Sequence, residues 1–168
     1  LEKLTQLTYL SLQNMTDVNI LTSLKGLEKL TRLMCVDLAL NQVASVEGLE
    51  KLPRLKILVL KNNQLSELPK GLEKLTHMRS LLLDENQLTS VAGLEKLTQL
   101  KDLNLGKNQL TELPKGLEKL TQIDSIGLYR NQLTSVKGLE KLTQLERLRL
   151  GKNQLTDVKG LEKLTQLT

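Results

Sequence analysis

The 168-residue sequence predicts an α/β solenoid. In this fold class a right-handed coil carries a concave parallel β-sheet on its inner side and short 3₁₀ or irregular turns on its convex side. Two observations predict it: the phrase GLEKL recurs with its glycines 22 or 23 residues apart, and leucines alternate with variable residues between the copies. Units of about 20 to 29 residues cannot bury an apolar face alone, so neighbours stack into one continuous core. The repeated glycines are Gly26, Gly48, Gly71, Gly93, Gly116, Gly138 and Gly160.

Each unit begins with an expected strand. The unit that starts at Leu100 reads LKDLNLGKNQLTELPKGLEKLTQ. Leu103 and Leu105 alternate with variable residues, which is the period-2 signature of a strand with one buried face. The same motif, with conservative apolar changes, begins at five other positions: Leu33, Leu55, Met78, Ile123 and Leu145.

The second half of each unit predicts the outer turn. Its length suits the crossover of about a dozen residues that joins parallel strands, and such crossovers are right-handed. Leu72 and Leu75 lie three residues apart, which fits one turn of 3₁₀ helix with both leucines inward and Glu-Lys facing water. Pro69 and Pro114 precede this turn in two units. The glycine before the turn is expected to allow a positive φ or a close approach of neighbouring coils.

An asparagine follows each strand where the chain turns away from the sheet. Its side-chain amide can satisfy backbone groups that the turn leaves unpaired, so stacked units predict a ladder of such bonds. We therefore interpret these asparagines as structural. They are Asn41, Asn63, Asn86, Asn108, Asn131 and Asn153.

The unit fits the pattern LxxLxLxxNxL, and over essentially the whole chain it resembles the leucine-rich repeat (LRR) family. The resemblance implies a horseshoe-shaped solenoid. The 22-residue units with Val-x-Gly-Leu-Glu-Lys-Leu resemble a short intracellular subfamily that includes a phosphatase regulatory subunit. The 23-residue units with Leu-Pro-Lys-Gly-Leu resemble a class common in bacterial proteins. The mixed lengths leave the subfamily open.

Residues 1–168 are expected to form a single domain of about seven coils. Leu7, Leu10 and Leu12 keep the repeat register, but the stretch NMTDVNILTSLKG breaks it and predicts an irregular loop or a degenerate first coil rather than a binding insert. The sequence starts with Leu and shows neither a signal peptide nor caps, so we expect an uncapped excerpt of a longer chain, with end-to-end self-association as one mode of contact for its uncapped termini. No apolar run reaches the length of a transmembrane helix.

Composition and motifs disfavour several function classes. Cys35 is the single cysteine, which rules out an internal disulfide framework; a cytoplasmic location is favoured, with a bacterial cell surface as the alternative. His77 is the single histidine, and no nucleophile, phosphate loop or metal-ligand spacing accompanies it, so no catalysis, cofactor or metal is expected. The net charge of +5 is compatible with a nucleic-acid ligand. However, much of the lysine lies in repeated Glu-Lys pairs and no basic run with interleaved aromatics occurs, so nucleic-acid binding is not expected.

Differences between the coils indicate a functional surface. The outer turns are nearly copies, whereas the non-leucine strand positions and the two residues after each strand vary. Alternation places the variable positions on the concave sheet or its rim. An apolar strip, flanking acids and an aromatic, basic end follow one another across the predicted face. The candidate partner-binding residues are Tyr9, Cys35, Asp37, Ile57, Val59, Lys61, Leu82, Asp84, Glu85, Asp102, Asn104, Tyr129, Arg130, Arg147, Arg149 and Lys152.

These features predict a non-enzymatic module that binds a protein or peptide on its concave face, without a small-molecule substrate. Apolar centres with surrounding charge, and Tyr and Arg as anchors, are typical of protein interfaces. Two alternatives remain: a regulatory or substrate-selecting repeat domain of a larger enzyme such as a GTPase or ubiquitin ligase, and a designed or consensus-like scaffold without a natural ligand. Drift of a solvent-exposed face after duplication also explains the variation.

Overall fold

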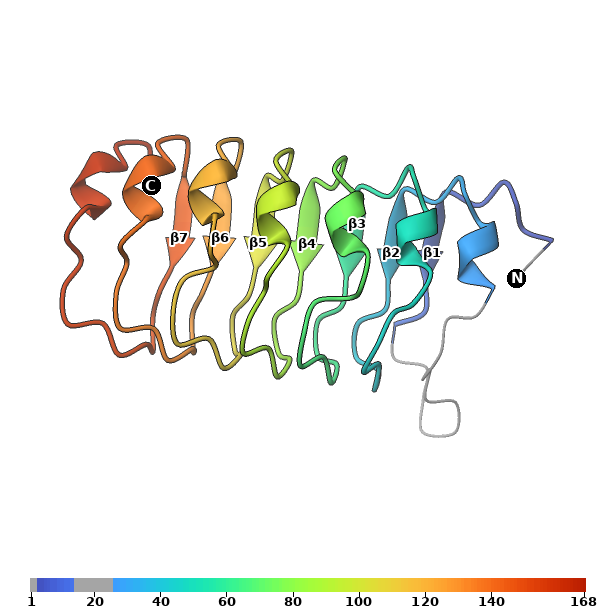
Figure 1. Cartoon of the computed structure of the whole chain (residues 1–168), viewed down its shortest axis with the longest axis horizontal. Helices are drawn as coiled ribbons and strands as arrows, with labels where there is room; N and C mark the ends of the chain where they lie inside the picture. The colour runs from blue at the N-terminus through green and yellow to red at the C-terminus, as the bar shows by residue number, and fades with distance from the viewer. Residues whose placement is uncertain (1–2, 14–25) are drawn as a thin grey trace.

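The computed structural model describes residues 3–13 and 26–168 (Figure 1). The expectation of an irregular loop or degenerate coil over residues 14–25 lies outside the described residues. In the described part, short strands alternate with 3₁₀ helices along the whole chain. The strands are β1 (Tyr9–Ser11), β2 (Cys35–Asp37), β3 (Ile57–Val59), β4 (Ser80–Leu82), β5 (Asp102–Asn104), β6 (Ser125–Gly127) and β7 (Arg147–Arg149). The 3₁₀ helices are η1 (Leu27–Lys29), η2 (Leu49–Lys51), η3 (Leu72–Lys74), η4 (Leu94–Lys96), η5 (Leu117–Lys119), η6 (Leu139–Lys141) and η7 (Leu161–Lys163).

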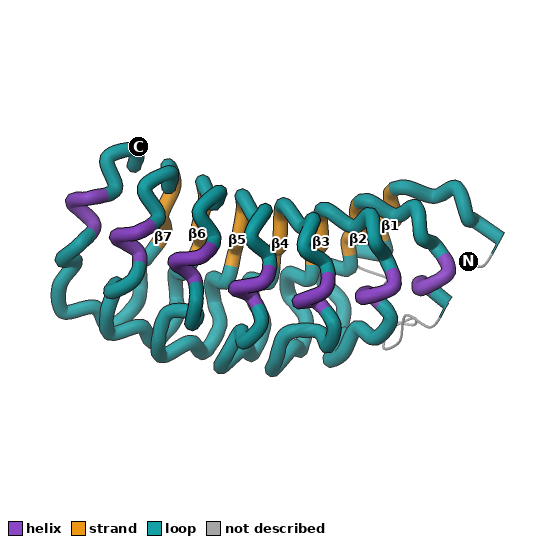
Figure 2. The backbone as a smooth tube through the Cα atoms, turned by 45° about the horizontal axis from the view of Figure 1, so that its top comes forward, coloured by secondary structure: helices purple, strands orange, loops and turns teal. Residues whose placement is uncertain are grey.

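The strands form one parallel sheet in chain order from β1 to β7. Each 3₁₀ helix lies on the opposite side of the coil from the strands, and loops join the two sides above and below (Figure 2). Each strand contacts the next strand, and each 3₁₀ helix contacts the next 3₁₀ helix. This arrangement confirms the predicted solenoid with its parallel sheet and 3₁₀ turns.

The core is a column of leucines between sheet and turns. The middle residue of each strand points inward, as Leu58, Leu81 and Leu103 show with no exposed surface. Both leucines of the outer turn also point inward, since Leu72 is 1% and Leu75 is 5% exposed. The two predicted periodicities, two in the strand and three in the turn, are thus confirmed.

The glycine before each outer turn has the positive φ expected of it, and some of these glycines also allow the expected close approach of neighbouring coils. All seven glycines have φ between 75° and 113°, which L side chains rarely adopt. At Gly71 a Cβ would also lie 2.6 Å from the Cβ of Glu50 in the preceding coil. Glycine therefore gives the turn its left-handed entry and, at Gly71, lets adjacent coils pack closely.

The glutamate of the outer turn is not the fully solvated residue that the sequence indicated. In four of the seven turns its carboxylate accepts the N–H of the glycine two residues earlier, for example at 2.8 Å between Glu28 and Gly26 and at 2.6 Å between Glu140 and Gly138. The pKa values of Glu28 and Glu140 are lowered, chiefly by the hydrogen bond from each residue's own backbone N–H and further by the glycine N–H. In these four turns the glutamate thus has a structural role, which weakens the contrast between constant turns and a variable concave face.

The asparagine ladder is confirmed. Asn108 Nδ2 donates to Leu83 O in the preceding coil at 3.0 Å and to Leu105 O in its own coil at 3.1 Å, while its Oδ1 accepts the N–H of Leu88 at 2.9 Å. Four of the six asparagines are buried accordingly. Within the described residues, Oδ1 of Asn41 has no hydrogen-bond partner.

The residue just before each ladder asparagine has a left-handed backbone that the sequence did not reveal. The φ angles at these positions lie between 51° and 61°. None of these residues is glycine, and only Asn62 is of a type that favours this region. The six residues are Leu40, Asn62, Glu85, Lys107, Arg130 and Lys152.

Candidate protein-binding face

The variable residues form three rows that cross the sheet from coil to coil. The strand register aligns the first strand residues in one row and the last strand residues in another. The first row is Tyr9, Cys35, Ile57, Ser80, Asp102, Ser125 and Arg147. The second row is Ser11, Asp37, Val59, Leu82, Asn104, Gly127 and Arg149. The third row, two residues after each strand, includes Ala39, Lys61, Asp84, Gly106, Tyr129 and Gly151.

An apolar patch occupies the first two rows over β1 to β4. We define it as Tyr9, Cys35, Ile57, Val59 and Leu82. Tyr9 pairs in register with Cys35, and Cys35 with Ile57. Tyr9 is 58% and Ile57 is 39% exposed, which is high for large apolar side chains. The structure therefore brings the residues of the predicted strip together, and Tyr9 joins them.

Cys35 belongs to this patch as an apolar residue. Its thiol is half-buried, and burial, with a smaller contribution from the Asp37 carboxylate, raises its pKa. A raised pKa keeps the thiol protonated at neutral pH, and the thiol is a poor nucleophile in that form.

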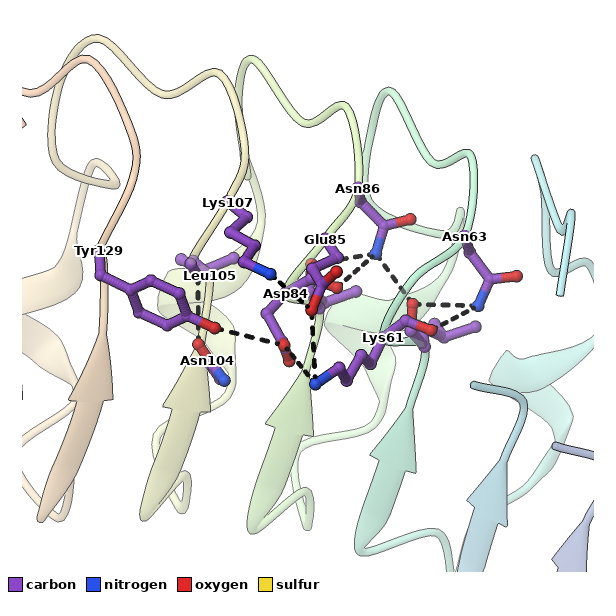
Figure 3. Close-up of polar contacts among 12 residues, drawn as sticks. Lys61, Asn63, Asp84, Glu85, Asn86, Asn104, Leu105, Lys107 and Tyr129 are labelled. Atoms are coloured by element: carbon purple, nitrogen blue, oxygen red, sulfur yellow. Dashed lines mark hydrogen bonds and ion pairs between the residues drawn. The ribbon is translucent and has the colours of Figure 1, made fainter. Parts of the chain in front are cut away.

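Asp84 is the centre of a polar network in the third row, and its placement corrects the prediction that it lies on the exposed face. The residue is only 2% exposed. Its Oδ2 accepts a hydrogen bond from the Tyr129 hydroxyl at 3.5 Å and pairs with Lys61 Nζ at 3.4 Å (Figure 3). The carboxylate is thus engaged within the chain, and a partner would meet Lys61 and Tyr129 instead.

Glu85 extends this network on its exposed side. Its Oε1 lies 3.1 Å from Lys107 Nζ and 3.5 Å from Lys61 Nζ, so it bridges lysines of the coils before and after it (Figure 3). The hydrogen bond from Lys107 is the largest cause of the lowered pKa of Glu85. Asp84 likewise raises the pKa of Lys61. The central charges predicted to contact a partner are therefore largely compensated among themselves.

Tyr129 reaches Asp84 because the coil between them carries a glycine. A Cβ at Gly106 would overlap the Tyr129 ring. The ring therefore lies over the Gly106 backbone, and a side chain that follows β6 contacts one that follows β4, two coils away. This contact spans 45 residues of sequence and fixes the orientation of the ring on the face.

Beyond this network, a hollow opens over β6. Its volume is about 370 Å³, and it forms because Ser125 and Gly127 carry small or no side chains between larger neighbours. Asn104 leans over Gly127, where a Cβ would meet its Oδ1. The lining residues are Leu82, Asp102, Asn104, Ser125, Ile126, Gly127, Arg147 and Arg149.

The two walls of the hollow differ in charge. On one side, Asp102 Oδ2 accepts a hydrogen bond from Ser80 Oγ at 3.2 Å. On the other side, Arg147 lies 3.7 Å from the Asp124 carboxylate with 62% of its side chain exposed. Arg149 forms no ion pair with any residue that the structure describes. The hollow therefore has two guanidinium groups on one wall and the single carboxylate of Asp102 on the other.

The remaining predicted residues lie at the rim or bond locally. Arg130 and Lys152 are exposed and occupy the left-handed position after their strands. Asp37 Oδ1 accepts the N–H of Ala39 at 3.0 Å, and Asn104 Oδ1 accepts that of Gly106 at 3.1 Å. Both side chains brace the chain where it leaves the sheet.

The described residues offer no visible centre for metal chemistry. They contain no group of three or more His, Cys, Asp or Glu side chains placed to hold a metal ion. His77 is exposed near the start of its coil. Within the same residues, no helix is long and apolar enough to cross a membrane. What the face presents is an apolar patch, a compensated polar row and a hollow with a basic wall.

Comparison with known proteins decides the family. A family model described as leucine-rich repeat matches residues 29–115, about half of the chain, and one described as two copies of leucine-rich repeats matches residues 121–163. The chain belongs to the leucine-rich repeat family. No curated protein sequence matches this LRR chain.

Solved structures of LRR proteins superpose on the chain over most of its length. A Leptospira interrogans LRR protein matches with a TM-score of 0.84 and 32% identity, over 89% of this chain and 40% of its own. An internalin from Listeria monocytogenes matches with a TM-score of 0.86 and 27% identity, over 99% of this chain and 47% of its own. The LRR ectodomain of an Arabidopsis thaliana membrane receptor kinase, solved in complex with CASPARIAN STRIP INTEGRITY FACTOR 2, matches with a TM-score of 0.75 and 26% identity, over 88% of this chain and 19% of its own.

The LRR chain thus spans less than half the length of these three proteins. LRR proteins generally mediate protein–protein interactions.

Proposed function

We propose that this chain is a recognition module that binds a protein or peptide partner on its concave face and carries out no chemistry of its own. The observation that carries the proposal is the apolar patch, because Tyr9 and Ile57 expose large apolar surfaces on a rigid sheet. Aromatic and aliphatic side chains surrounded by charge are the usual anchors of interfaces. The receptor kinase ectodomain, an LRR structure solved in complex with CASPARIAN STRIP INTEGRITY FACTOR 2, supports a binding role for an LRR solenoid.

The size of the face supports this proposal. Seven strands at a spacing of about 4.8 Å give a sheet about 30 Å wide. A stable interface needs about 800 Å² on each partner. A sheet of this width, with its three rows of side chains, offers an area of that order.

The two ends of the face have different roles in the proposal. The apolar patch supplies affinity, since buried apolar anchors carry most binding energy. Arg130, Arg147 and Arg149 attract and orient an acidic segment of the partner, since rim charges act mainly on association and specificity. The polar network of Lys61, Asp84 and Glu85, whose charges pair with one another, lies between the two ends.

Substitution at each end separates these roles. Val59→Asp should abolish binding at any salt concentration, because it places a charge in the apolar patch. Arg147→Glu with Arg149→Glu should mainly slow association at low ionic strength, and the effect should shrink as salt shortens the screening length toward about 8 Å. Association and dissociation rates, measured by surface plasmon resonance with a partner recovered by pull-down, report both effects.

Lys96→Asp in an outer turn is the matched control for the introduced charge, because Lys96 is exposed on the convex side. Circular dichroism melts establish that each variant is folded. Intact binding by the concave variants, together with loss of binding in the Lys96 variant, would show that the concave variation is drift.

A further inference from the structure

We infer that the hollow over β6 receives one acidic side chain of an extended partner segment, and that the same segment places a bulky apolar side chain on the apolar patch about four residues away. This inference rests on the proposed binding at the concave face and specifies the chemistry and spacing of the partner. It uses the position of the hollow, the state of its walls and the register of the sheet.

The state of the walls selects an acidic group. On the Asp102 side, Asp102 Oδ2 accepts a hydrogen bond from the Ser80 hydroxyl and Asn104 Oδ1 accepts one from a backbone N–H, so this wall carries a single carboxylate against the two guanidinium groups opposite. On the opposite wall, Arg149 has no ion-pair partner among the described residues, and Arg147 has only the 3.7 Å contact with Asp124. Guanidinium groups bind carboxylates through paired, charge-assisted hydrogen bonds.

The small floor of the hollow lets a carboxylate reach these arginines. Ser125 and Gly127 are the two outward positions of β6. In the sheet register, Ser125 lies between Asp102 and Arg147, and Gly127 lies between Asn104 and Arg149. A volume of about 370 Å³ lies within the range of small ligand sites, about 300 to 1,000 Å³, and exceeds what one carboxylate fills. The remaining space can admit the backbone that carries the side chain.

The sheet register sets the distance from this hollow to the patch. The hollow is centred on β6, whereas Ile57 and Val59 lie on β3, three strands away. Three strand spacings of about 4.8 Å amount to about 14 Å. An extended chain advances about 3.3 to 3.6 Å per residue, so about four residues cover that distance.

The same spacing satisfies the alternation of an extended chain. Side chains of an extended segment point alternately to opposite faces, so residues four apart point the same way. Residues three or five apart would direct one of the two side chains away from the sheet. Leu82 lines the hollow and also belongs to the apolar patch, so a segment crossing between them keeps apolar contact on the way.

Synthetic peptides test this inference directly. The probes are short glycine–serine peptides, acetylated and amidated at their ends, with one glutamate and one leucine placed three, four or five residues apart. A fourth probe carries glutamine for glutamate at the four-residue spacing. Two-dimensional NMR of the isotope-labelled chain follows the backbone amides of Ser125 and Gly127 in the hollow and of Ile57 and Val59 in the patch during titration.

The four-residue glutamate peptide should shift the amides of both sites together and bind about tenfold more tightly than the glutamine peptide, which is the scale of one charge-assisted hydrogen bond. Two variants should each reduce the affinity for the glutamate peptide to that for the glutamine peptide. Ser125→Phe does so by filling the hollow, and Arg149→Gln by removing a charge that has no ion-pair partner among the described residues. Lys141→Gln, which removes an outer-turn charge, should leave both affinities unchanged. If Ser125→Phe fails to fold, Arg149→Gln provides the same comparison.

Three outcomes would overturn the inference. Equal affinity for glutamate and glutamine peptides, with shifts at Ile57 and Val59 only, would remove the acidic site and leave binding at the concave face standing. Equal affinity at all three spacings would refute the fixed distance between the sites. Shifts confined to outer-turn amides, or no shifts at all, would overturn both the inference and the proposed function.

Discussion

Replacing one ladder asparagine by alanine tests how the coils are held together. Asn108 is 8% exposed, and its side chain bonds the backbone of both its own coil and the preceding one. In Asn108→Ala the two amide hydrogens and the accepting oxygen are lost together. The carbonyl of Leu83 and the N–H of Leu88 then lose their partner in a site that water reaches poorly.

The magnitude follows from the count of bonds. The two hydrogens of Nδ2 serve two of the three carbonyls within reach at any time, and Oδ1 accepts one further bond. Each of these three bonds contributes about 1 kcal/mol net. We therefore expect Asn108→Ala to lower the free energy of unfolding by about 3 kcal/mol.

Asn41→Ala is the matched control. Its Nδ2 bonds are present, at 2.9 Å to Leu12 O and 3.0 Å to Leu38 O, but among the described residues its Oδ1 has no partner. Asn41 is also only half-buried, so water can replace part of what is lost. The cost of this substitution should be about 1 to 2 kcal/mol, clearly below that at Asn108.

Urea unfolding followed by circular dichroism measures both values. The midpoint should fall without a change in slope, since the surface exposed on unfolding is nearly the same in each variant. A loss below about 0.5 kcal/mol at Asn108, which is the range of ordinary surface substitutions, would show that the ladder does not stabilise the stack. Equal losses at both positions would refute the assignment of the difference to Oδ1.

Three further changes test the core, the left-handed positions and the turn glutamates. Leu103→Ala should cost about 2 to 5 kcal/mol in urea unfolding because the side chain is fully buried, whereas Lys96→Ala should stay within about 0.5; equal effects would refute the strand register. Leu40→Asn should raise the free energy of unfolding by about 0.5 to 1 kcal/mol, because Leu40 is 41% exposed and has a φ of 57°, a left-handed conformation that Asn adopts more easily than Leu. The control Gln42→Asn should give no gain, and equal stabilities of the two variants would argue against strain at Leu40. The folded pKa values of Glu28 and Glu140 lie below the ordinary 4.5, so their contribution to stability is present above pH 4.5 and is lost as the pH falls through the folded value. In thermal melts between pH 7 and pH 3, the double variant Glu28→Gln/Glu140→Gln should therefore lose less stability on acidification than the wild type, and identical pH profiles would contradict this role.

The sequence predicted those features that repeat in every coil. Alternation placed Leu103 inward, the three-residue spacing placed Leu72 and Leu75 in a 3₁₀ turn, and the asparagines formed the expected ladder. Each of these follows from a local period that six or seven copies repeat. The repeat family could be recognised from the sequence for the same reason.

Features that depend on contacts between particular coils could not be predicted from the repeat pattern. Asp84 is buried because Tyr129, two coils away, can lie over Gly106, and no local pattern indicates such a contact. The left-handed backbone at Leu40 and Arg130 was missed because neither residue favours that region. The repeated Glu-Lys pair gave no sign that its glutamate bonds the preceding glycine.

The hollow could have been predicted from the sequence by comparing the coils position by position. Aligning the strands by their repeat places Ser125 and Gly127 beside Arg147 and Arg149, and small residues beside large ones indicate a depression. The leaning of Asn104 over Gly127 could not be read from that alignment, because it depends on the rotamer of one side chain.

The measurement that tests the central claim most directly is site-specific photo-cross-linking of the chain to its partner. A benzophenone amino acid is placed at Ile57 or Ser80 on the concave face and, in matched variants, at Lys74 or Lys119 in the outer turns. After irradiation with a partner recovered by pull-down, adducts should form from the concave positions and not from the outer turns. Efficient cross-links from Lys74 or Lys119, with none from Ile57 or Ser80, would contradict binding at the concave face.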